Sequence, residues 1–276
     1  MVNNGGFSGS LLLVGCGKMG GALLGGWLDQ GVAADAMLVV EPTLDAARSG
    51  VPAGVTVLAD AGGIPADFAP AVVIFAVKPQ VMADVVPNYA RFVADGAVFL
   101  SIAAGTPIRF FESNLGAGAA VVRVMPNTPA AVRRGMSVLC ANSQASAGQR
   151  DLCGDLMAAV GETAWLSDEG LMDAVTAVSG SGPAYVFHLI ECLAQAGVEV
   201  GLEPELSARL ALQTVAGSGE LARLSDDAAA QLRINVTSPG GTTQAALEVL
   251  MAKDGLQPLM TAAVRAAEKR GRELGA

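Results

Sequence analysis

Residues 10–20 read SLLLVGCGKMG, and this stretch decides the fold of the first half of the chain. The short apolar run 10–14 is typical of a buried strand, and residues 22–30 have helical character. A strand, a Gly-x-Gly-x-x-Gly pattern and a helix in this order favour dinucleotide binding over an unrelated glycine-rich turn. The glycines would permit the tight turn, the approach of a pyrophosphate and close helix packing. The residues expected at the nucleotide are Gly15, Cys16, Gly17, Lys18, Met19 and Gly20.

A second apolar run, residues 36–40, is followed directly by Glu41, which stands 21 positions after Gly20. An acidic residue at this point accepts hydrogen bonds from the adenosine ribose hydroxyls of NAD. Arg48, a little further on, is suited instead to the 2′-phosphate of NADP. Glu41 therefore favours NADH slightly, although a solvated carboxylate at the end of a strand is an equally good interpretation.

Further apolar runs predict strands at 55–58, 71–77, 97–102, 119–125, 137–140 and 163–166, with helices at 79–92, 107–115 and 146–159. Short apolar runs that alternate with helices indicate a parallel sheet covered on both faces. Ligands bind such sheets beyond the carboxyl ends of the strands. Three segments that end in proline follow strands there, at 77–79, 103–107 and 125–129, and they are either ordinary loops or the lining of a nicotinamide pocket. The residues predicted to contact the cofactor are Ala76, Val77, Lys78, Pro79, Ala103, Ala104, Met125, Asn127 and Thr128.

From residue 167 the pattern changes to one helix after another. Helices are predicted at 169–178, 183–198, 204–224, 227–232, 243–251 and 258–274. The sequence thus predicts an α/β protein with a Rossmann-type doubly wound sheet in residues 1–166 and an all-α domain in residues 167–276. This domain is apolar and has few charges to coat it, so we expect it to pack against a second copy of itself.

Two loops of small residues open helices in the second half of the chain. Residues 236–243 read VTSPGGTT, and residues 179–185 read SGSGPAY. Two adjacent glycines let backbone N–H groups converge, and free N–H groups at a helix start form an anion site. The interpretation is a cradle for a small carboxylate or phosphate, and the alternative is a pair of capped turns. The substrate-binding residues predicted here are Ser179, Gly180, Ser181, Ser238, Pro239, Gly240, Gly241, Thr242 and Thr243.

Composition excludes several functions. The chain of 276 residues has a formal net charge of −9, which argues against nucleic acid and against an anionic membrane surface. His188 is the sole histidine, so a histidine-ligated metal site or a Ser-His-Asp triad lacks material, and no metal is predicted. The four cysteines have neither metal-like nor CxxC spacing, and the N-terminus lacks the basic start of a secretory signal. A reduced, cytoplasmic protein is the simple expectation.

Taken together, these motifs resemble the pyrroline-5-carboxylate reductase family over nearly the whole chain. The resemblance rests on the glycine-rich stretch 15–20, FAVKP at 75–79, MPNTP at 125–129, SGSGPAY at 179–185 and, most specifically, NVTSPGGTT at 235–243. It implies reduction of L-1-pyrroline-5-carboxylate to L-proline with NADPH or NADH, the last step of proline synthesis. It also implies a homodimer with interlocked helical dimerisation domains, often built into a decamer.

The resemblance assigns roles to particular residues. It implies that the Ser-Pro-Gly-Gly loop holds the substrate carboxylate through backbone amides, and that Thr243 lies near the imine nitrogen as the catalytic residue. Relatives that prefer NADP tend to lack an acid at the position of Glu41, so the resemblance leaves the preferred cofactor open. His188 is interpreted as a core or interface residue, not as a general acid.

Other functions fit the sequence less well. A β-hydroxyacid dehydrogenase would need a lysine in the helical domain, where Lys253 and Lys269 both fall within the last 24 residues. A lactate-type dehydrogenase needs a histidine base, and only His188 exists. A non-catalytic NAD-binding sensor, or a regulatory protein that uses its helical domain to bind a partner, would have no use for two small-residue loops. The reductase is therefore the favoured function.

Overall fold

The structure is a computed structural model that describes residues 9–43 and 51–275, and Arg48 lies outside the described residues. Contacts divide the chain into two compact units. The first comprises residues up to Gly180 together with those from Glu268 onward, and the second is Ser181–Ala267. These units are defined by contacts between residues, whereas the domain boundary predicted between residues 166 and 167 is based on the change in sequence pattern. That boundary stays a prediction.

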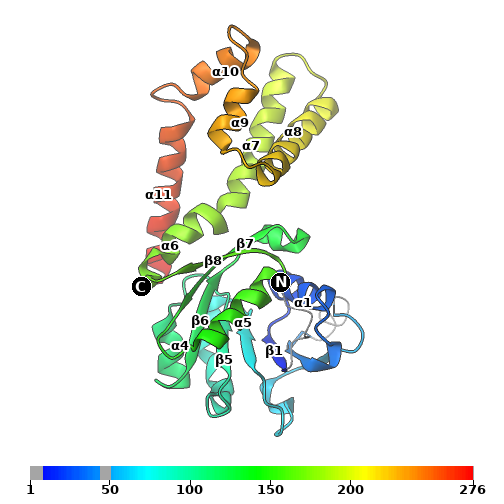
Figure 1. The fold of residues 1–276 in the computed structure, drawn as a ribbon, viewed down its shortest axis with the longest axis vertical. Coiled ribbons are helices and arrows are strands. Elements are labelled where there is room, and N and C mark those ends of the chain that lie inside the picture. The colour runs from blue at the N-terminus through cyan, green and yellow to red at the C-terminus, as the bar shows by residue number, and fades with distance from the viewer. Residues whose placement is uncertain (1–8, 44–50, 276) are drawn as a thin grey trace. The chain divides into compact units, whose positions relative to one another are not determined.

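The first unit is built on an eight-stranded sheet with the order β3-β2-β1-β4-β5-β6-β7-β8 (Figure 1). The strands up to β6 are all parallel, and their order is the Rossmann arrangement that the sequence predicts. The eight strands of the sheet are β1 Leu11–Val14, β2 Met37–Val40, β3 Thr56–Leu58, β4 Val72–Phe75, β5 Val98–Ser101, β6 Ala120–Met125, β7 Gly135–Ala141 and β8 Gly161–Leu166.

The sheet is parallel, as predicted, except at one pair of strands, because β7 pairs antiparallel with β6. The cause is the short connection, residues 126–134, which holds only the 3₁₀ helix η5 (Thr128–Val132). A parallel return needs a crossover of roughly a dozen residues or more. The next connection contains α5 (Ala147–Ala158), and β8 accordingly runs parallel to β7.

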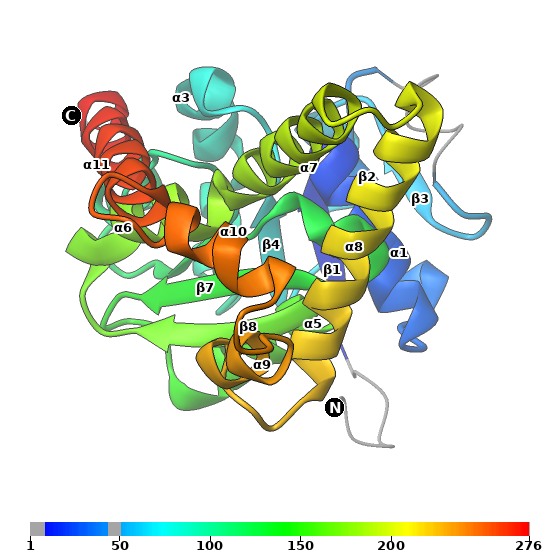
Figure 2. The same cartoon turned by 90° about the horizontal axis from the view of Figure 1, so that it is seen from above.

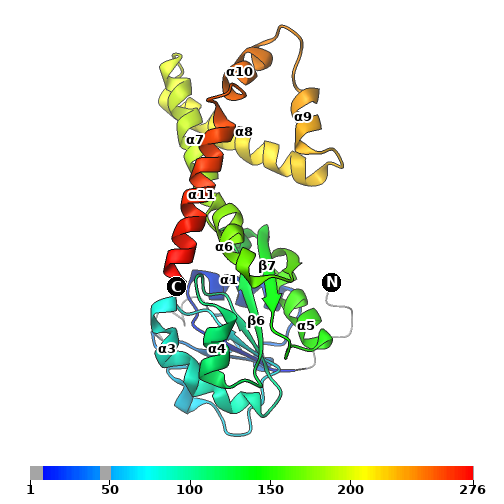
Figure 3. The ribbon, with the colours of Figure 1, turned by 90° about the vertical axis from the view of Figure 1, so that its left-hand side faces the viewer.

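Helices cover both faces of this sheet (Figure 3). The helix α1 (Lys18–Asp29) and α5 pack on one face, where the buried Trp27 Nε1 donates a hydrogen bond to Leu156 O at 2.9 Å. The helix α4 (Ile108–Leu115) and the 3₁₀ helix η4 (Val86–Val93) pack on the other. The alternating side chains of β1 show the same division, since Leu11 and Leu13 join one cluster and Leu12 and Val14 the other.

The helix predicted at 79–92 is present as three shorter pieces, the 3₁₀ helix η3 (Pro79–Val81), α3 (Met82–Val85) and η4. Pro87 accounts for part of this break, because proline lacks the N–H that an α-helical hydrogen bond needs. The other short elements of the first unit are η1 Ala34–Ala36, η2 Ala61–Gly63, η6 Glu169–Leu171, α6 Met172–Val175 and the π-helix η7 Thr176–Gly180.

The second unit is helical, as predicted. A helical hairpin of α7 (Gly182–Glu199) and α8 (Pro204–Leu224) forms its main part (Figure 2). Gly197 permits the close approach of the two helices, because a Cβ there would lie 2.1 Å from Ser207 Oγ. The remaining helices are α9 Ala229–Asn235, which the sequence placed at 227–232, α10 Thr242–Leu250 and α11 Leu256–Leu274, whose residues from Glu268 onward belong to the first unit.

Few side chains of the second unit are buried. Within the described helices, Ser207 and Ala211 of α8 are buried, and none of α7, α9 or α10 is. The face of α8 that carries Leu206, Leu210 and Leu221 is exposed. A search of the described residues finds no helix with the length and apolar character that a membrane span needs.

Candidate active site

The glycine-rich loop between β1 and α1 has the geometry that its glycines require. Gly15 has a φ of 90°, and a Cβ there would lie 2.7 Å from Val77 Cγ1. A Cβ at Gly20 would lie 2.6 Å from Gly15 O, so this glycine allows the helix to approach the turn. Gly17 is the N-cap of α1 and has no atom near its missing Cβ. The loop thus presents an open helix N-terminus, which suits a pyrophosphate.

Glu41 lies beside this loop, where the sequence placed it. Its Oε2 accepts the Cys16 N–H at 2.9 Å, and its Oε1 accepts the Thr43 N–H at 3.1 Å. Burial, with the nearby Glu41 carboxylate, raises the pKa of the Cys16 thiol. Cys16 therefore stays a neutral thiol near neutral pH. The Glu41 carboxylate therefore holds the loop through backbone hydrogen bonds. Its contact with ribose hydroxyls stays a prediction.

The three segments predicted to line a nicotinamide pocket follow β4, β5 and β6. These strands are parallel neighbours, so their carboxyl ends meet at one edge of the sheet. A cavity of about 730 Å³ there is lined by Pro79 and Ala104, among other residues. Ala76 and Val77 lie against Gly15, Ala103 is buried, and Ala104, Lys78 and Thr128 are exposed.

The end of β6 also meets the first small-residue loop. Asn127 Nδ2 donates to Ser179 Oγ at 3.3 Å, and Asn127 Oδ1 accepts the Met136 N–H at 2.9 Å. A Cβ at Gly180 would lie 2.4 Å from Met125 Cε. Ser179 and Gly180 end the π-helix η7, an irregularity that occurs often at functional sites. Two predicted cofactor residues and two predicted substrate residues are thus neighbours within the first unit, whereas Ser181 begins the second unit.

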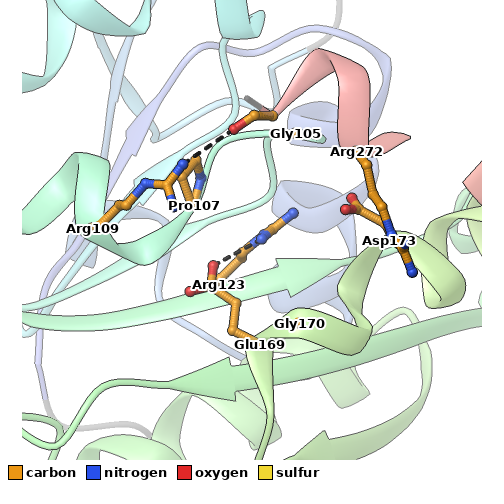
Figure 4. A pocket seen from close by; sticks show the side chains of 9 residues that line it. Gly105, Pro107, Arg109, Arg123, Glu169, Gly170, Asp173 and Arg272 are labelled. Carbon is orange, nitrogen blue, oxygen red and sulfur yellow. Dashed lines mark hydrogen bonds and ion pairs between the residues drawn. The ribbon is translucent and has the colours of Figure 1, made fainter. Parts of the chain in front are cut away.

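Sequence reasoning missed a charged pocket beside these loops. The pocket has a volume of about 360 Å³ and is lined by Arg109, Arg123, Glu169, Asp173 and Arg272, among others (Figure 4). Arg123 Nη1 and Glu169 Oε1 are 2.8 Å apart, and Arg109 Nη2 donates to Gly275 O at 3.4 Å. The signal that could have found it is a single arginine inside the strand AVVRVM, residues 120–125.

The Ser-Pro-Gly-Gly loop of the second unit is a closed turn. Gly241 N–H donates to Ser238 O at 3.0 Å, and Gly240 has a φ of 70°, with Pro239 before it. This agrees with a type II turn, which takes proline at its second position and glycine at its third. Gln244 Oε1 accepts the Gly240 N–H at 2.8 Å. Both glycine N–H groups, which the sequence suggested as free donors, are therefore paired inside the loop.

The helix that follows supplies other donors. α10 begins at Thr242 with Gly241 as its N-cap, without a side-chain cap. The first intrahelical bond runs from Ala245 N–H to Gly241 O at 3.2 Å, so the N–H groups of residues 242–244 precede it. An anion at this end of α10 would meet these N–H groups and the hydroxyls of Thr242 and Thr243.

His188 is exposed on α7, so it is not a core residue of this chain, and its place in an interface stays a prediction. Its Nδ1 lies 3.0 Å from Glu191 Oε2, and its Nε2 lies 3.5 Å from Cys192 Sγ. All three side chains project from about one turn of the same helix.

Known proteins are similar to this chain over nearly its whole length. A family model described as pyrroline-5-carboxylate reductase dimerisation matches residues 169–274, and one described as NADP oxidoreductase coenzyme F420-dependent matches residues 10–105. The pyrroline-5-carboxylate reductase of Pseudomonas aeruginosa is 42% identical over 265 residues, and that of Pisum sativum is 38% identical over 268 residues. Each alignment covers 96% of both chains.

Solved structures give the same result. The pyrroline-5-carboxylate reductase of Coxiella burnetii has a TM-score of 0.90 at 32% identity, covering 98% of this chain and 100% of that one. The Plasmodium falciparum pyrroline carboxylate reductase, solved with NADP bound, has a TM-score of 0.81 at 30% identity, covering 98% and 99%.

The doubly wound sheet, the glycine-rich loop and the helical second unit define a dinucleotide-dependent oxidoreductase. Identity of 42% along almost the whole length then narrows the class to one family. The chain belongs to the pyrroline-5-carboxylate reductase family.

Proposed function

We propose that this protein reduces L-1-pyrroline-5-carboxylate to L-proline with NADPH or NADH, the last step of proline biosynthesis. The observation that carries the proposal is the 42% identity with the Pseudomonas aeruginosa reductase across 96% of both chains. The glycine-rich loop before α1 and the start of α10 after the Ser-Pro-Gly-Gly turn support it, because each is a helix N-terminus suited to an anionic ligand.

The reaction requires a hydride at the imine carbon and a proton at the imine nitrogen. The reduced nicotinamide supplies the hydride when it is bound. The loop at Gly15–Gly20 holds the pyrophosphate, and the segments after β4, β5 and β6 surround the nicotinamide. The protein's contribution is orientation and the exclusion of water, which can lower a barrier by roughly 7 kcal/mol in favourable cases.

The start of α10 holds the substrate. The N–H groups of Thr242 and Thr243 bind the carboxylate, and the positive end of the helix dipole favours its charge. The Ser238–Gly241 turn fixes the direction of this helix start. The Thr243 hydroxyl orients the imine nitrogen, and a cyclic imine that is already protonated near neutral pH needs no strong acid from the protein.

Glu41 favours NADH over NADPH as the hydride donor. Its carboxylate stands at the end of β2, where it would accept hydrogen bonds from ribose hydroxyls and repel a 2′-phosphate. The NADP-bound relative from Plasmodium falciparum belongs to the same family, so both cofactors need to be compared directly.

The proposed assembly is a homodimer through the helical unit, with a decamer as the higher form. The exposed apolar face of α8 and the match to a dimerisation model support self-association. The proposed location is the cytoplasm. The net charge of −9 supports a protein that binds neither nucleic acid nor an anionic membrane surface.

The test is the loss of NADH absorbance, and separately of NADPH absorbance, when pyrroline-5-carboxylate is added to the purified protein. Oxidation that depends on the imine is the expected result, and the faster cofactor is expected to be NADH. A folded protein that binds NADH but oxidises neither cofactor with this imine would overturn the proposal and favour an NAD-binding sensor.

A further inference from the structure

Arg123 stands in the middle of β6 and is 7% exposed, although its neighbours along the strand are apolar. A buried guanidinium is stable only when it is paired. Its Nη1 donates to Glu169 Oε1 at 2.8 Å, and Figure 4 shows the two side chains pointing toward each other. Glu169 is the first residue of the 3₁₀ helix η6, which begins three residues after the end of β8, so the pair connects β6 to the segment that follows β8.

The same carboxylate oxygen has a second partner. Glu169 Oε1 accepts the N–H of Ile108 at 2.9 Å, and Ile108 is the first residue of α4. The N-cap of α4 is Pro107, which makes no side-chain cap hydrogen bond, so Glu169 supplies the acceptor that this helix start lacks. A negative charge at a helix N-terminus is also favoured by the helix dipole.

The partners of Glu169 lie next to the two segments that follow β5 and β6. Arg123 lies two residues before Met125 and four before Asn127, which contacts Ser179. Ile108 follows the segment 103–107 that lines the larger cavity. One oxygen of Glu169 therefore fixes the spacing between the segment after β5 and the segment after β6, the two that are proposed to surround the nicotinamide.

We propose that Glu169 and Arg123 are positioning residues that set the nicotinamide half of the cofactor site. The inference rests on the proposed function for the identity of the cofactor. Stability alone is a weak reason for this pair, because a well-packed apolar pair of similar volume commonly serves a buried position as well or better. The adenosine half of the site, at residues 15–20 and 41, is distant in the sheet order and does not touch the pair.

The test compares NADH with ADP-ribose, which carries the pyrophosphate and adenosine but no nicotinamide. In Glu169→Gln, we expect the Kd of NADH to rise about tenfold while the Kd of ADP-ribose stays within about twofold of the wild-type value. A purely structural role would weaken both ligands together. Glu169→Asp and Arg123→Lys retain the charges and are expected to recover part of the NADH affinity. Glu273→Gln makes the same chemical change in the exposed Arg270 pair and is expected to change neither Kd.

The double variant Arg123→Met with Glu169→Leu keeps the test decisive if Glu169→Gln unfolds. It fills the same space without charge, so it is expected to fold and to bind ADP-ribose normally while binding NADH weakly. Normal NADH affinity in a folded double variant would overturn the proposal, as would an equal loss of ADP-ribose and NADH affinity in Glu169→Gln. Both readouts are binding measurements, so they are independent of whether the imine is the substrate.

Discussion

Gly240 lies in the turn that precedes α10, the helix start proposed to bind the substrate. Its φ of 70° is in the left-handed region, where a side chain costs about 1 kcal/mol or more. Gly240→Ala is expected to distort the turn and raise the KM for the imine severalfold, whereas Gly240→Asn should lose less because asparagine tolerates this conformation. Steady-state kinetics of the two variants would check this, and equal KM values for Gly240→Ala and wild type would contradict it.

A substitution at Thr243, the second residue of α10, tests the proposed contact with the imine nitrogen. Thr243→Ala removes one hydroxyl, and the loss of one hydrogen bond of about 1.5 kcal/mol should lower kcat/KM for the imine about tenfold. The Kd for NADH should not change, because the residue is placed with the substrate. Thr243→Ser keeps the hydroxyl and is the matched control. An unchanged kcat/KM in Thr243→Ala would remove Thr243 from the site.

At this scale the sequence predicted motifs better than contacts. The turn at residues 238–241 follows from its own Pro-Gly-Gly sequence, and so could be anticipated. The pairing of Gly240 N–H with Gln244 could not, because it depends on which rotamer a surface glutamine adopts. The Arg123–Glu169 pair joins residues 46 positions apart, and only the folded sheet brings them together.

At the scale of elements, α1 offers a matched pair of glycines. A Cβ at Gly26 would lie 2.8 Å from Val160 Cγ1, whereas a Cβ at Gly21 would have no atom within 4 Å. Gly26→Ala should destabilise the protein by about 1–3 kcal/mol through overpacking, despite the better helix propensity of alanine. Gly21→Ala should be neutral or stabilising by up to about 1 kcal/mol. Thermal unfolding distinguishes them, and equal melting temperatures would show that α1 shifts freely.

Elements were largely predictable, and the exceptions have physical causes. The apolar runs marked the central strands β1, β2, β4 and β5 most clearly, because every residue of these strands is buried and such a strand cannot alternate with polar residues. The direction of β7 could not be predicted from its residues, because an apolar run has the same hydrophobicity in a parallel and in an antiparallel strand. Only the length of the connection 126–134 indicates the direction of β7, because this connection is too short for the crossover that a parallel strand would need.

For the whole molecule, the apolar face of α8 gives a prediction about assembly. Leu210 is 48% exposed in the isolated chain. A two-fold dimer would bury two copies of the substituted side chain, one from each subunit, so Leu210→Glu should cost several kcal/mol and dissociate the protein to monomers. Val132→Glu is the control, because Val132 is 69% exposed in the first unit. Light scattering after size-exclusion chromatography would measure the masses, and an intact oligomer in Leu210→Glu would place the interface elsewhere.

The first compact unit is discontinuous in sequence, because it includes the residues from Glu268 onward. There, Gly275 O accepts a hydrogen bond from Arg109, and a Cβ at Gly271 would lie 3.2 Å from Asp173 Oδ1. A ribosome makes the N-terminal residues first, at roughly 5–20 residues per second. The sheet can therefore form early in translation, but the contacts of the segment 105–109 with the end of α11 can form only after that helix has been made. The proposed nicotinamide site would then be complete only after synthesis of the helical unit, and a stalled nascent chain would hold a sheet in which that proposed site is unfinished.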